Sequence, residues 1–345
     1  MLPLPEFSLL APDTLAEVVA LLAEHRGHAR LLAGGTDLLV NLKHRFVDAR
    51  TLIHLKGVHE LRHITTLDDG TTAIGAAVTL AELRDHPELQ RHLPALAHAA
   101  SLVASPQIQN MGTLGGNVCL DTRCVYINQT HFWRQALGYC LKKDGTECHV
   151  VKGGQLCVAA QSSDTVPVLI NHAALLEIVG PDGLRTLPIE QLYKKDGAQH
   201  LTLANDELLA RILIPPPSPT LRSTYVKHRT RQSIDFPILS FAVAVDLDPE
   251  ALITDLRIAA TCINSRPRAI KRLDRLALGK PLDDALIADI AAECARQLNP
   301  LDNIMSDPAW RKTMIPVMIT RALQALIPQA ALTPRPALTP RPPLP

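Results

Sequence analysis

Aromatic residues are scarce, at 3% of the 345-residue chain, so a core must be built mainly from Leu, Ala, Val and Ile. An excess of one charge is also lacking, because 35 basic residues face 34 acidic ones. This balance argues against nucleic acid or an anionic membrane surface as a partner. No apolar stretch approaches the roughly 20 residues that span a bilayer. The N-terminus lacks the basic start and apolar run of a signal peptide, so we expect a cytosolic protein without a membrane span.

Two hydrolase signatures are missing as well, since the chain has neither a Gly-x-Ser-x-Gly elbow nor a His-Glu-x-x-His pair. What stands out instead is a pair of glycine turns. The first is Leu31-Leu32-Ala33-Gly34-Gly35-Thr36-Asp37-Leu38, which reads as a strand, a tight turn and the start of a helix. It lacks the Lys of a P-loop and the third glycine of a dinucleotide fingerprint. By spacing alone it is either a phosphate-binding turn or an ordinary strand-to-helix connection.

The second turn is Gly112-Thr113-Leu114-Gly115-Gly116-Asn117. Clustered glycines indicate unusual backbone angles or close approach of the backbone to another group. Two such loops in one chain suit a diphosphate held from two sides, because successive N–H groups can point at one anion.

Cysteine supplies the third feature. The chain has seven, an odd number, and in the cytosol such a set favours a metal site over a disulfide framework. Cys124, Cys140, Cys148 and Cys157 lie in one segment, separated by 15, 7 and 8 residues. They form no Cys-x-x-Cys pair, which is atypical of structural zinc, and they fit neither common ferredoxin run. Spacing alone leaves an iron–sulfur site, zinc and four unrelated thiols open.

The other cysteines and the nearby histidines are weaker ligand candidates. Cys119 competes as a ligand because it lies five residues before Cys124. Cys262 and Cys294 have apolar neighbours typical of core thiols. His131 and His149 lie in the Cys segment, where we interpret them as surface histidines. Farther on, Lys227 and Arg229 share one face of a predicted strand, which is either a solvated face or a ligand-facing one.

The sequence predicts three structural parts and a tail. Residues 1–55 form an N-terminal α/β lobe, with a helix over 12–22, strands at 29–33 and 51–55, and a helix over 38–43. Residues 56–220 form a second lobe, in which Thr79 caps a helix and about 120–160 is an insert. Residues 221–330 begin with strands at 223–229, 238–245 and 256–260 and end with helices near 284–297 and 308–327. The Pro-rich tail, 331–345, is expected to be disordered.

In this order the motifs resemble the FAD-binding subunit of the xanthine dehydrogenase, or molybdenum hydroxylase, family. The resemblance covers the chain to about residue 327. It is carried by the two glycine turns, by 74–79 and 164–167, and by Tyr225 to Pro237. It implies an α+β fold: a two-lobed FAD-binding domain of the vanillyl-alcohol-oxidase (PCMH-like) type, and a C-terminal CO-dehydrogenase-flavoprotein-like α+β domain with a three-stranded sheet.

The resemblance also implies the residues that contact FAD. The first loop, Leu31 to Leu38, and the second, Gly112 to Asn117, would bind the diphosphate, largely through backbone groups. Asp164 matches an Asp on the nucleotide side, and Lys227 matches a Lys near the isoalloxazine. Val103 and Leu209 match flanking apolar contacts. No catalytic residue is expected on this chain, because the chemistry would take place on a partner subunit.

The chain departs from the family pattern between Asn117 and Asp164, where most members have a far shorter interval. This arrangement is similar to one branch, the β subunit of 4-hydroxybenzoyl-CoA reductase, whose insert binds a [4Fe–4S] cluster. The resemblance therefore implies that Cys124, Cys140, Cys148 and Cys157 are cluster ligands and that Cys119 is not. It also implies a molybdopterin-binding large subunit and a small subunit with two [2Fe–2S] clusters, in a dimer of heterotrimers. Electrons would pass from a ferredoxin-like donor through [4Fe–4S], FAD and [2Fe–2S] to molybdenum.

Overall fold

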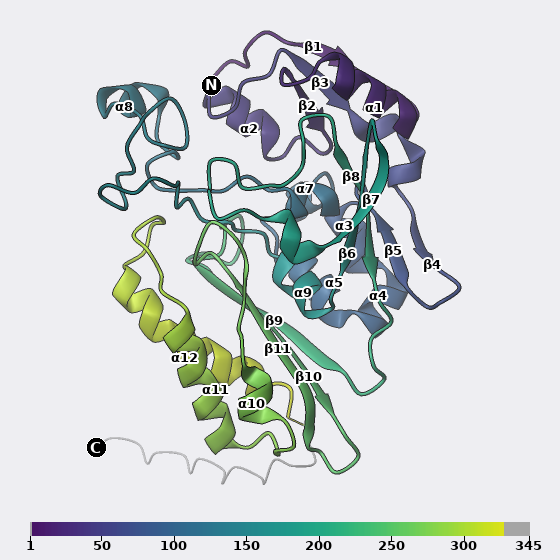
Figure 1. Ribbon diagram of the computed structural model, residues 1–345, viewed down its shortest axis with the longest axis vertical. Coiled ribbons are helices and arrows are strands. Elements are labelled where there is room, and N and C mark those ends of the chain that lie inside the picture. Colours follow the sequence, from purple (N-terminus) through teal and green to yellow (C-terminus); the bar gives the residue numbers. More distant parts are fainter. Residues whose placement is uncertain (1, 328–345) are drawn as a thin grey trace, which may run out of the picture.

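The computed structural model describes residues 2–327, which form three β-sheets with helices packed around them (Figure 1). The first sheet is parallel, in the order β1-β3-β2, and lies at the N-terminal end of the molecule. Its strands are Ser8–Leu10 (β1), Ala29–Leu32 (β2) and Thr51–His54 (β3). Helix α1 (Leu15–Glu24) begins after Thr14, whose hydroxyl accepts a hydrogen bond from the Glu17 N–H. Helix α2 (Leu38–Lys43) directly follows the first glycine loop, as the sequence predicted.

The second sheet has five antiparallel strands in the order β4-β5-β8-β6-β7. These are Ile64–Thr66 (β4), Thr72–Gly75 (β5), Leu175–Gly180 (β6), Gly183–Pro188 (β7) and Leu208–Ile214 (β8). Its helices are Leu80–Asp85 (α3), Pro87–His92 (α4), Pro94–Ser101 (α5), Pro106–Gln109 (α6), Leu114–Val118 (α7) and Val166–Asn171 (α9).

Thr79 caps α3, as its sequence context predicted. Its hydroxyl accepts from the Glu82 N–H at 3.2 Å, and the Glu82 carboxylate accepts from the Thr79 N–H at 2.7 Å. The next residue, Leu80, donates its N–H to the Gly112 carbonyl at 2.9 Å. The capped helix therefore fixes the backbone at the start of the second glycine loop.

The C-terminal sheet is antiparallel, in the order β12-β11-β10-β9. Its strands are Arg222–His228 (β9), Leu239–Leu247 (β10), Ile253–Thr261 (β11) and Arg268–Ala269 (β12), and its helices are Leu273–Ala277 (α10), Asp284–Gln297 (α11) and Pro308–Gln324 (α12). The expectation of three strands is corrected to four, because the two residues of β12 pair with β11. Two residues give no period-two hydrophobic pattern, so the sequence carried no signal for this strand.

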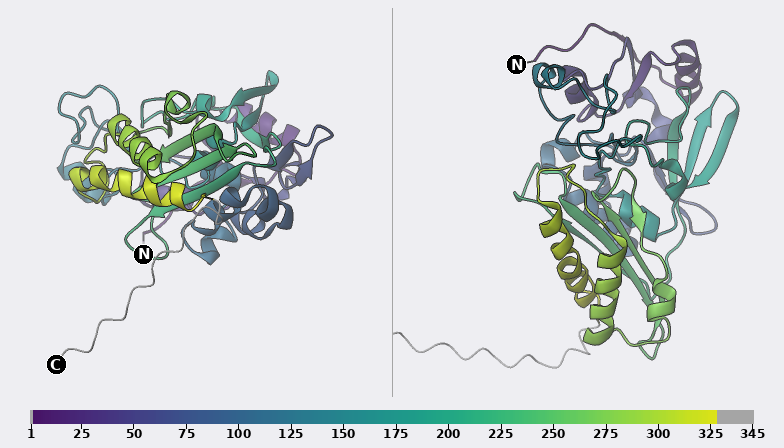
Figure 2. Two further views of the ribbon diagram at one scale, coloured as in Figure 1. Left: turned by 90° about the horizontal axis from the view of Figure 1, so that it is seen from below. Right: turned by 60° about the vertical axis from the view of Figure 1, so that its left-hand side comes forward.

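Strand β10 is buried on both faces, because it lies between two hydrophobic cores. Phe241, Val243 and Val245 belong to the core beneath α11 and α12, whereas Ala242 belongs to the core around β5, β6 and β8. Successive side chains point to opposite faces of a strand, so neighbouring residues of β10 pack into different cores. Small residues of β10 face α9, and large ones face the C-terminal helices, which cover the sheet from one side (Figures 1 and 2).

The predicted insert is mostly irregular chain with one short helix, His131–Ala136 (α8), and lies beside the N-terminal lobe (Figures 1 and 2). Arg134 anchors it: this side chain is 2% exposed and donates to the carbonyls of His44 at 2.8 Å and Arg45 at 3.3 Å. On the other side, the Val125 N–H donates to the Asn303 carbonyl of the C-terminal domain at 2.9 Å. The predicted Pro-rich tail lies outside the described residues. Within 2–327, no helix is long and apolar enough to cross a membrane.

His172, at the end of α9, predicts a pH-dependent stability. It is 5% exposed, and burial lowers its pKa to about 4, with Arg257 of β11 adding to the effect. Between about pH 4 and 6.5 the unfolded chain binds a proton there that the folded chain does not. The free energy of unfolding should therefore fall by about 3 kcal/mol as the pH drops through this window.

The variant His172→Gln should flatten this part of the pH profile, measured as urea unfolding midpoints between pH 4 and 7. His92→Gln is the matched control, since His92 is exposed. An unchanged slope in His172→Gln would show that other groups dominate the acid sensitivity.

Candidate flavin and thiol sites

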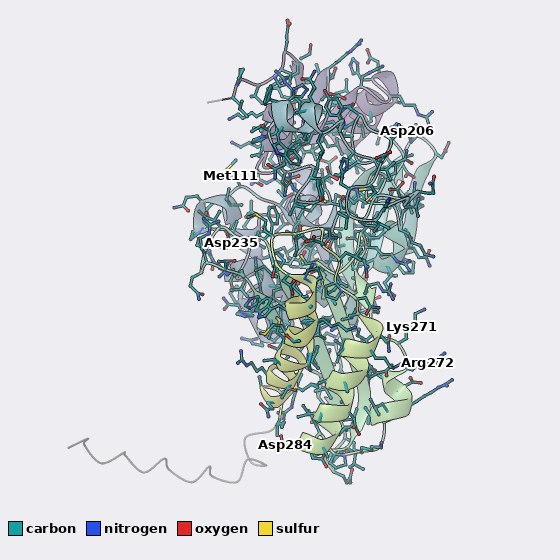
Figure 3. All side chains as sticks on the ribbon, turned by 90° about the vertical axis from the view of Figure 1, so that its left-hand side faces the viewer. Met111, Asp206, Asp235, Lys271, Arg272 and Asp284 are labelled. Carbon is teal, nitrogen blue, oxygen red and sulfur yellow. The ribbon has the colours of Figure 1, made fainter. Side chains whose placement is uncertain are left out.

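The two glycine loops touch each other through their backbones. A Cβ added to Gly34 would lie 1.7 Å from the Met111 carbonyl oxygen and 3.0 Å from the Gly112 nitrogen. No side chain fits in that space, so glycine is required for the contact. Met111 itself points outward and is 54% exposed, at the molecular surface (Figure 3). The sequence predicted both loops, and the structure brings them together.

The first loop leaves a row of donors unused. Among the hydrogen bonds of residues 2–327, none is donated by the backbone N–H groups of Gly34, Gly35, Thr36 or Asp37. Every residue from Leu31 to Leu38 is half-buried, and Gly35 has φ +71°, a conformation that glycine adopts readily. Successive free N–H groups on such a turn form a concave site for an anion.

The second loop is held more rigidly. Leu114 donates to the Val78 carbonyl at 2.9 Å and Gly115 to the Ala76 carbonyl at 2.8 Å, so the loop runs along the chain that follows β5. The Gly116 N–H is taken by the Thr113 hydroxyl at 3.1 Å. Of the residues from Gly112 to Asn117, only Gly116 is exposed. This loop therefore contributes a fixed wall, whereas the first contributes the free donors.

Asn117, at the end of the second loop, reaches across to the chain that follows the insert. Its side-chain oxygen accepts from the Ser163 hydroxyl at 2.6 Å, the Thr165 hydroxyl at 2.7 Å and the Thr165 N–H at 3.2 Å. These contacts fix the backbone on both sides of Asp164. Two residues that the sequence separates by the whole insert are thereby neighbours.

Asp164 forms a buried ion pair with Lys227 of β9. Their side chains are 4% and 1% exposed, and the Lys227 ammonium lies 3.0 Å from Oδ2. The Tyr225 hydroxyl donates to Oδ1 at 2.5 Å. Burial raises the pKa of Asp164, and the ammonium and the two hydrogen bonds limit the rise. A solvated strand face is therefore the wrong interpretation for Lys227.

Lys227 also contacts the chain next to Val103, one of the two apolar contacts predicted from the sequence. Lys227 and Arg229 both donate to the Leu102 carbonyl, at 2.9 and 3.1 Å, next to Val103. Val103 and Leu209, in β8, belong to the same core cluster as Leu114 and Tyr225. Contacts thus link the loops, Asp164, Lys227 and Val103 into one region, whereas Leu209 is joined to it only through the core.

Arg123 is a neighbour of this region that no motif predicted. Its guanidinium forms an ion pair with Asp37 of the first loop and lies 5.8 and 5.7 Å from the ring centroids of Phe46 and Phe236. Burial raises the pKa of Asp37, and Arg123 opposes that rise. The residue lies in irregular chain, so neither a period nor a spacing could reveal it.

The four predicted thiol ligands line one cavity. Cys124, Cys140, Cys148 and Cys157 line a small cavity of about 20 Å³, partly open to solvent, together with Tyr126, Lys142 and His149. Burial raises the pKa of Cys124 to about 12 and that of Cys157 to about 11. The sequence placed these residues in one segment, and the fold turns all four toward the same space.

The four thiols form no site for a single metal ion. Over residues 2–327, no three His, Cys, Asp or Glu side chains come close enough to hold a single metal ion. A [4Fe–4S] cube spreads its ligands over four irons, so its thiolates stand farther apart than those around one zinc. By number and chemistry, the four thiols fit such a cluster.

The remaining cysteines lie elsewhere. Cys119 packs against the core of the FAD domain, and burial raises its pKa to about 12. Cys262 and Cys294 are buried, as predicted for core thiols. His131 is exposed, as predicted, but His149 lines the thiol cavity and its Nε2 lies 2.5 Å from the Tyr139 carbonyl. The surface interpretation of His149 is corrected accordingly.

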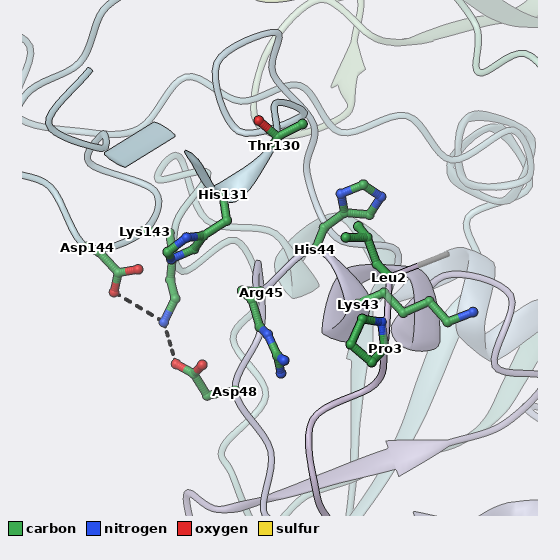
Figure 4. A pocket seen from close by; sticks show the side chains of 10 residues that line it. All are labelled: Leu2, Pro3, Lys43, His44, Arg45, Asp48, Thr130, His131, Lys143 and Asp144. Carbon is green, nitrogen blue, oxygen red and sulfur yellow. Dashed lines mark hydrogen bonds and ion pairs between the residues drawn. The ribbon is translucent and has the colours of Figure 1, made fainter. Parts of the chain in front are cut away.

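A larger hollow, about 590 Å³, lies between the insert and the N-terminal lobe, away from the glycine loops (Figure 4). Lys143 lies on its insert side and forms ion pairs with Asp48 and Asp144. None of the predicted flavin or thiol residues lines it.

Comparison with known proteins shows the family of this chain. Residues 5–217 match the family model described as the FAD binding domain in molybdopterin dehydrogenase, and residues 224–326 match that of the CO dehydrogenase flavoprotein C-terminal domain. The chain is 28% identical over 318 residues to the putative xanthine dehydrogenase FAD-binding subunit of Escherichia coli strain K12, covering 92% of this chain and 94% of the relative. It is 29% identical over 328 residues to the carbon monoxide dehydrogenase medium chain of Hydrogenophaga pseudoflava, covering 94% and 98%.

A solved structure of carbon monoxide dehydrogenase from Hydrogenophaga pseudoflava superposes with a TM-score of 0.78, at 25% identity, over 94% of this chain and 98% of that one. The α+β architecture inferred from the sequence is thereby confirmed. The chain belongs to the FAD-binding subunits of the molybdenum hydroxylase family. It is therefore a flavoprotein subunit of an oxidoreductase.

The backbone contact between the loops predicts unequal effects for two neighbouring glycines. Gly34→Ala should drive Met111 away and abolish most FAD binding, because the added Cβ meets backbone atoms. Gly35→Ala should cost only about 1–2 kcal/mol of stability, from backbone strain, because its Cβ meets flexible leucine tips. FAD per chain and melting temperature test this. Equal flavin loss in both variants would contradict the role of the loop contact.

Proposed function

We propose that this chain is the FAD and [4Fe–4S] electron-transfer subunit of a molybdenum enzyme of the 4-hydroxybenzoyl-CoA reductase type. The observation that carries the proposal is the convergence of Cys124, Cys140, Cys148 and Cys157 on one cavity. An ordinary flavin subunit has no need of four thiols there. The assembled enzyme would use a ferredoxin-like donor to convert 4-hydroxybenzoyl-CoA into benzoyl-CoA.

FAD would lie along the first glycine loop and extend toward Lys227. The free N–H groups from Gly34 to Asp37 would bind the diphosphate, and the second loop, near Gly116, would confine it. FAD supplies one- and two-electron transfer when bound, and a [4Fe–4S] cluster supplies one-electron transfer. Lys227 would place positive charge near a reduced, anionic flavin, while Asp164 and Tyr225 hold its ammonium in position.

The partners in the proposal follow from the names of the relatives. A medium chain implies a larger and a smaller companion, which here would be a molybdopterin-binding subunit and a subunit with two [2Fe–2S] clusters, in a dimer of heterotrimers. The substrate would bind on the large subunit. A cytosolic location remains part of the proposal, and the seven cysteines are all free, as a reducing compartment requires.

A second candidate is the FAD subunit of another molybdenum hydroxylase that delivers electrons to NAD. The names of the relatives favour it, since they include xanthine, nicotinate and carbon monoxide dehydrogenases. The thiol cavity would then have a structural role, for example with zinc. Anaerobic addition of NADH separates the two: rapid bleaching of the flavin favours this candidate, and bleaching only by reduced ferredoxin favours the reductase.

The cluster can be tested by its composition. The chain purified anaerobically should contain FAD with about four iron and a matching amount of acid-labile sulfide. Cys124→Ser should lose most of the iron and retain FAD, because the thiol cavity and the glycine loops are separate sites.

Cys119→Ser is the control, since this thiol packs against the core instead of lining the cavity. It should keep both cofactors. Zinc without iron in the unmodified chain, or iron loss in Cys119→Ser as large as in Cys124→Ser, would refute the ligand assignment.

A further inference from the structure

Lys142 is a buried cation beside the four thiols. Its side chain is 7% exposed, and its ammonium donates to Asp121 Oδ1 at 2.8 Å, the Thr122 hydroxyl at 2.8 Å and the Gly197 carbonyl at 2.9 Å. All three N–H bonds are therefore used. Burying an ammonium is costly, so three partners indicate a built position rather than a chance contact.

The turn that holds Lys142 also holds one of the thiol residues. Asp196 Oδ1 accepts from the Cys157 N–H at 3.1 Å, and the Gly197 N–H donates to the Cys157 carbonyl at 2.8 Å. A Cβ on Gly197 would lie about 3 Å from Cys157 and Ala159 backbone atoms, so the turn packs tightly against this segment. Lys142 and Cys157 are thus fixed relative to each other by a single turn.

Only one member of the ion pair between Lys142 and Asp121 lines the thiol cavity. Lys142 is among the residues that line the thiol cavity, whereas Asp121 is not. The Lys142 side chain therefore forms part of the cavity wall, and the Asp121 carboxylate does not. Of the residues lining this cavity, Lys142 is the one with a permanent positive charge.

We propose that Lys142 is a positioning residue that supplies the counter-charge of the four-thiolate centre and sets its reduction potential. This inference rests on the proposed function. Adding one electron makes a cluster with four thiolates more negative, and a fixed nearby cation stabilises the reduced state more than the oxidised one. Asp121, which pairs with the ammonium but does not line the cavity, weakens that effect.

The test is a redox titration of the full chain, purified anaerobically with its co-purifying subunits. The reduced cluster is quantified by low-temperature electron paramagnetic resonance at fixed ambient potentials. Lys142→Met should lower the ratio of reduced to oxidised centre about tenfold at a given potential, a shift of about 59 mV for a one-electron couple. Lys142→Arg should restore most of it.

Two further variants separate charge from structure. Asp121→Asn removes the negative end of the pair, so it should raise the potential, a shift opposite in sign to that of Lys142→Met. Lys143→Met is the matched control, because this neighbouring lysine pairs with Asp48 and Asp144 and lines the other hollow. It should leave the potential unchanged.

The outcomes are distinct. An unmodified chain without iron refutes the proposed function and this inference together. Iron present, with equal potentials in Lys142→Met and the unmodified chain, refutes only the inference. If Lys142→Met fails to retain iron, retention in Lys142→Arg supports the counter-charge, and loss in both refutes it. A lower potential in Asp121→Asn would also refute it, because structural loosening would explain both variants.

Discussion

The buried ion pair between Asp164 and Lys227 is the contact on which the rest of the site depends. It joins the chain that follows the insert to strand β9 of the C-terminal sheet, and Lys227 also reaches the carbonyl at the end of α5. A charge buried in this way is tolerated only when its partner is present, and removing one partner typically costs 3–5 kcal/mol. The relative placement of the FAD-binding domain and the C-terminal sheet is therefore coupled to the position of the Lys227 ammonium group. Tyr225 also fixes the orientation of Asp164, since its hydroxyl donates to the carboxylate oxygen that Lys227 does not contact.

Much of this could be predicted because it is local. The Thr79 cap, the glycine turns and the apolar strand segments of β9 to β11 each leave a signal within a few residues, and the structure contains all of them. The contacts that the sequence did not reveal are long-range. Lys227 looked like half of a solvated strand face, because its partner Asp164 lies 63 residues away. Arg123 and Lys142 belong to irregular chain, where no period relates a residue to its surroundings, so their partners emerge only from the fold.

The insert shows how irregular chain can be held in place with little secondary structure. Its apolar cluster is small, and buried cations carry much of its order, with Arg134 on the carbonyls at the end of α2 and Lys142 on the turn at Gly197. Guanidinium and ammonium groups suit this task because each offers several donors to backbone carbonyls that no helix or sheet engages. The four thiols also lie in irregular chain, where no helix or strand fixes their direction, and they face a common space.

Asn117 allows the length of the insert to vary without moving the rest of the structure. Its amide oxygen binds Ser163, 46 residues farther along the chain, so both ends of the intervening segment meet at one side chain. A loop whose ends are pinned together can lengthen or shorten without moving the scaffold, and the entropic cost of extra length grows only slowly. Residues can therefore be inserted at this point without displacing the neighbouring glycine loop. The cysteine segment can therefore differ in length while the chain on either side of it stays fixed at Asn117.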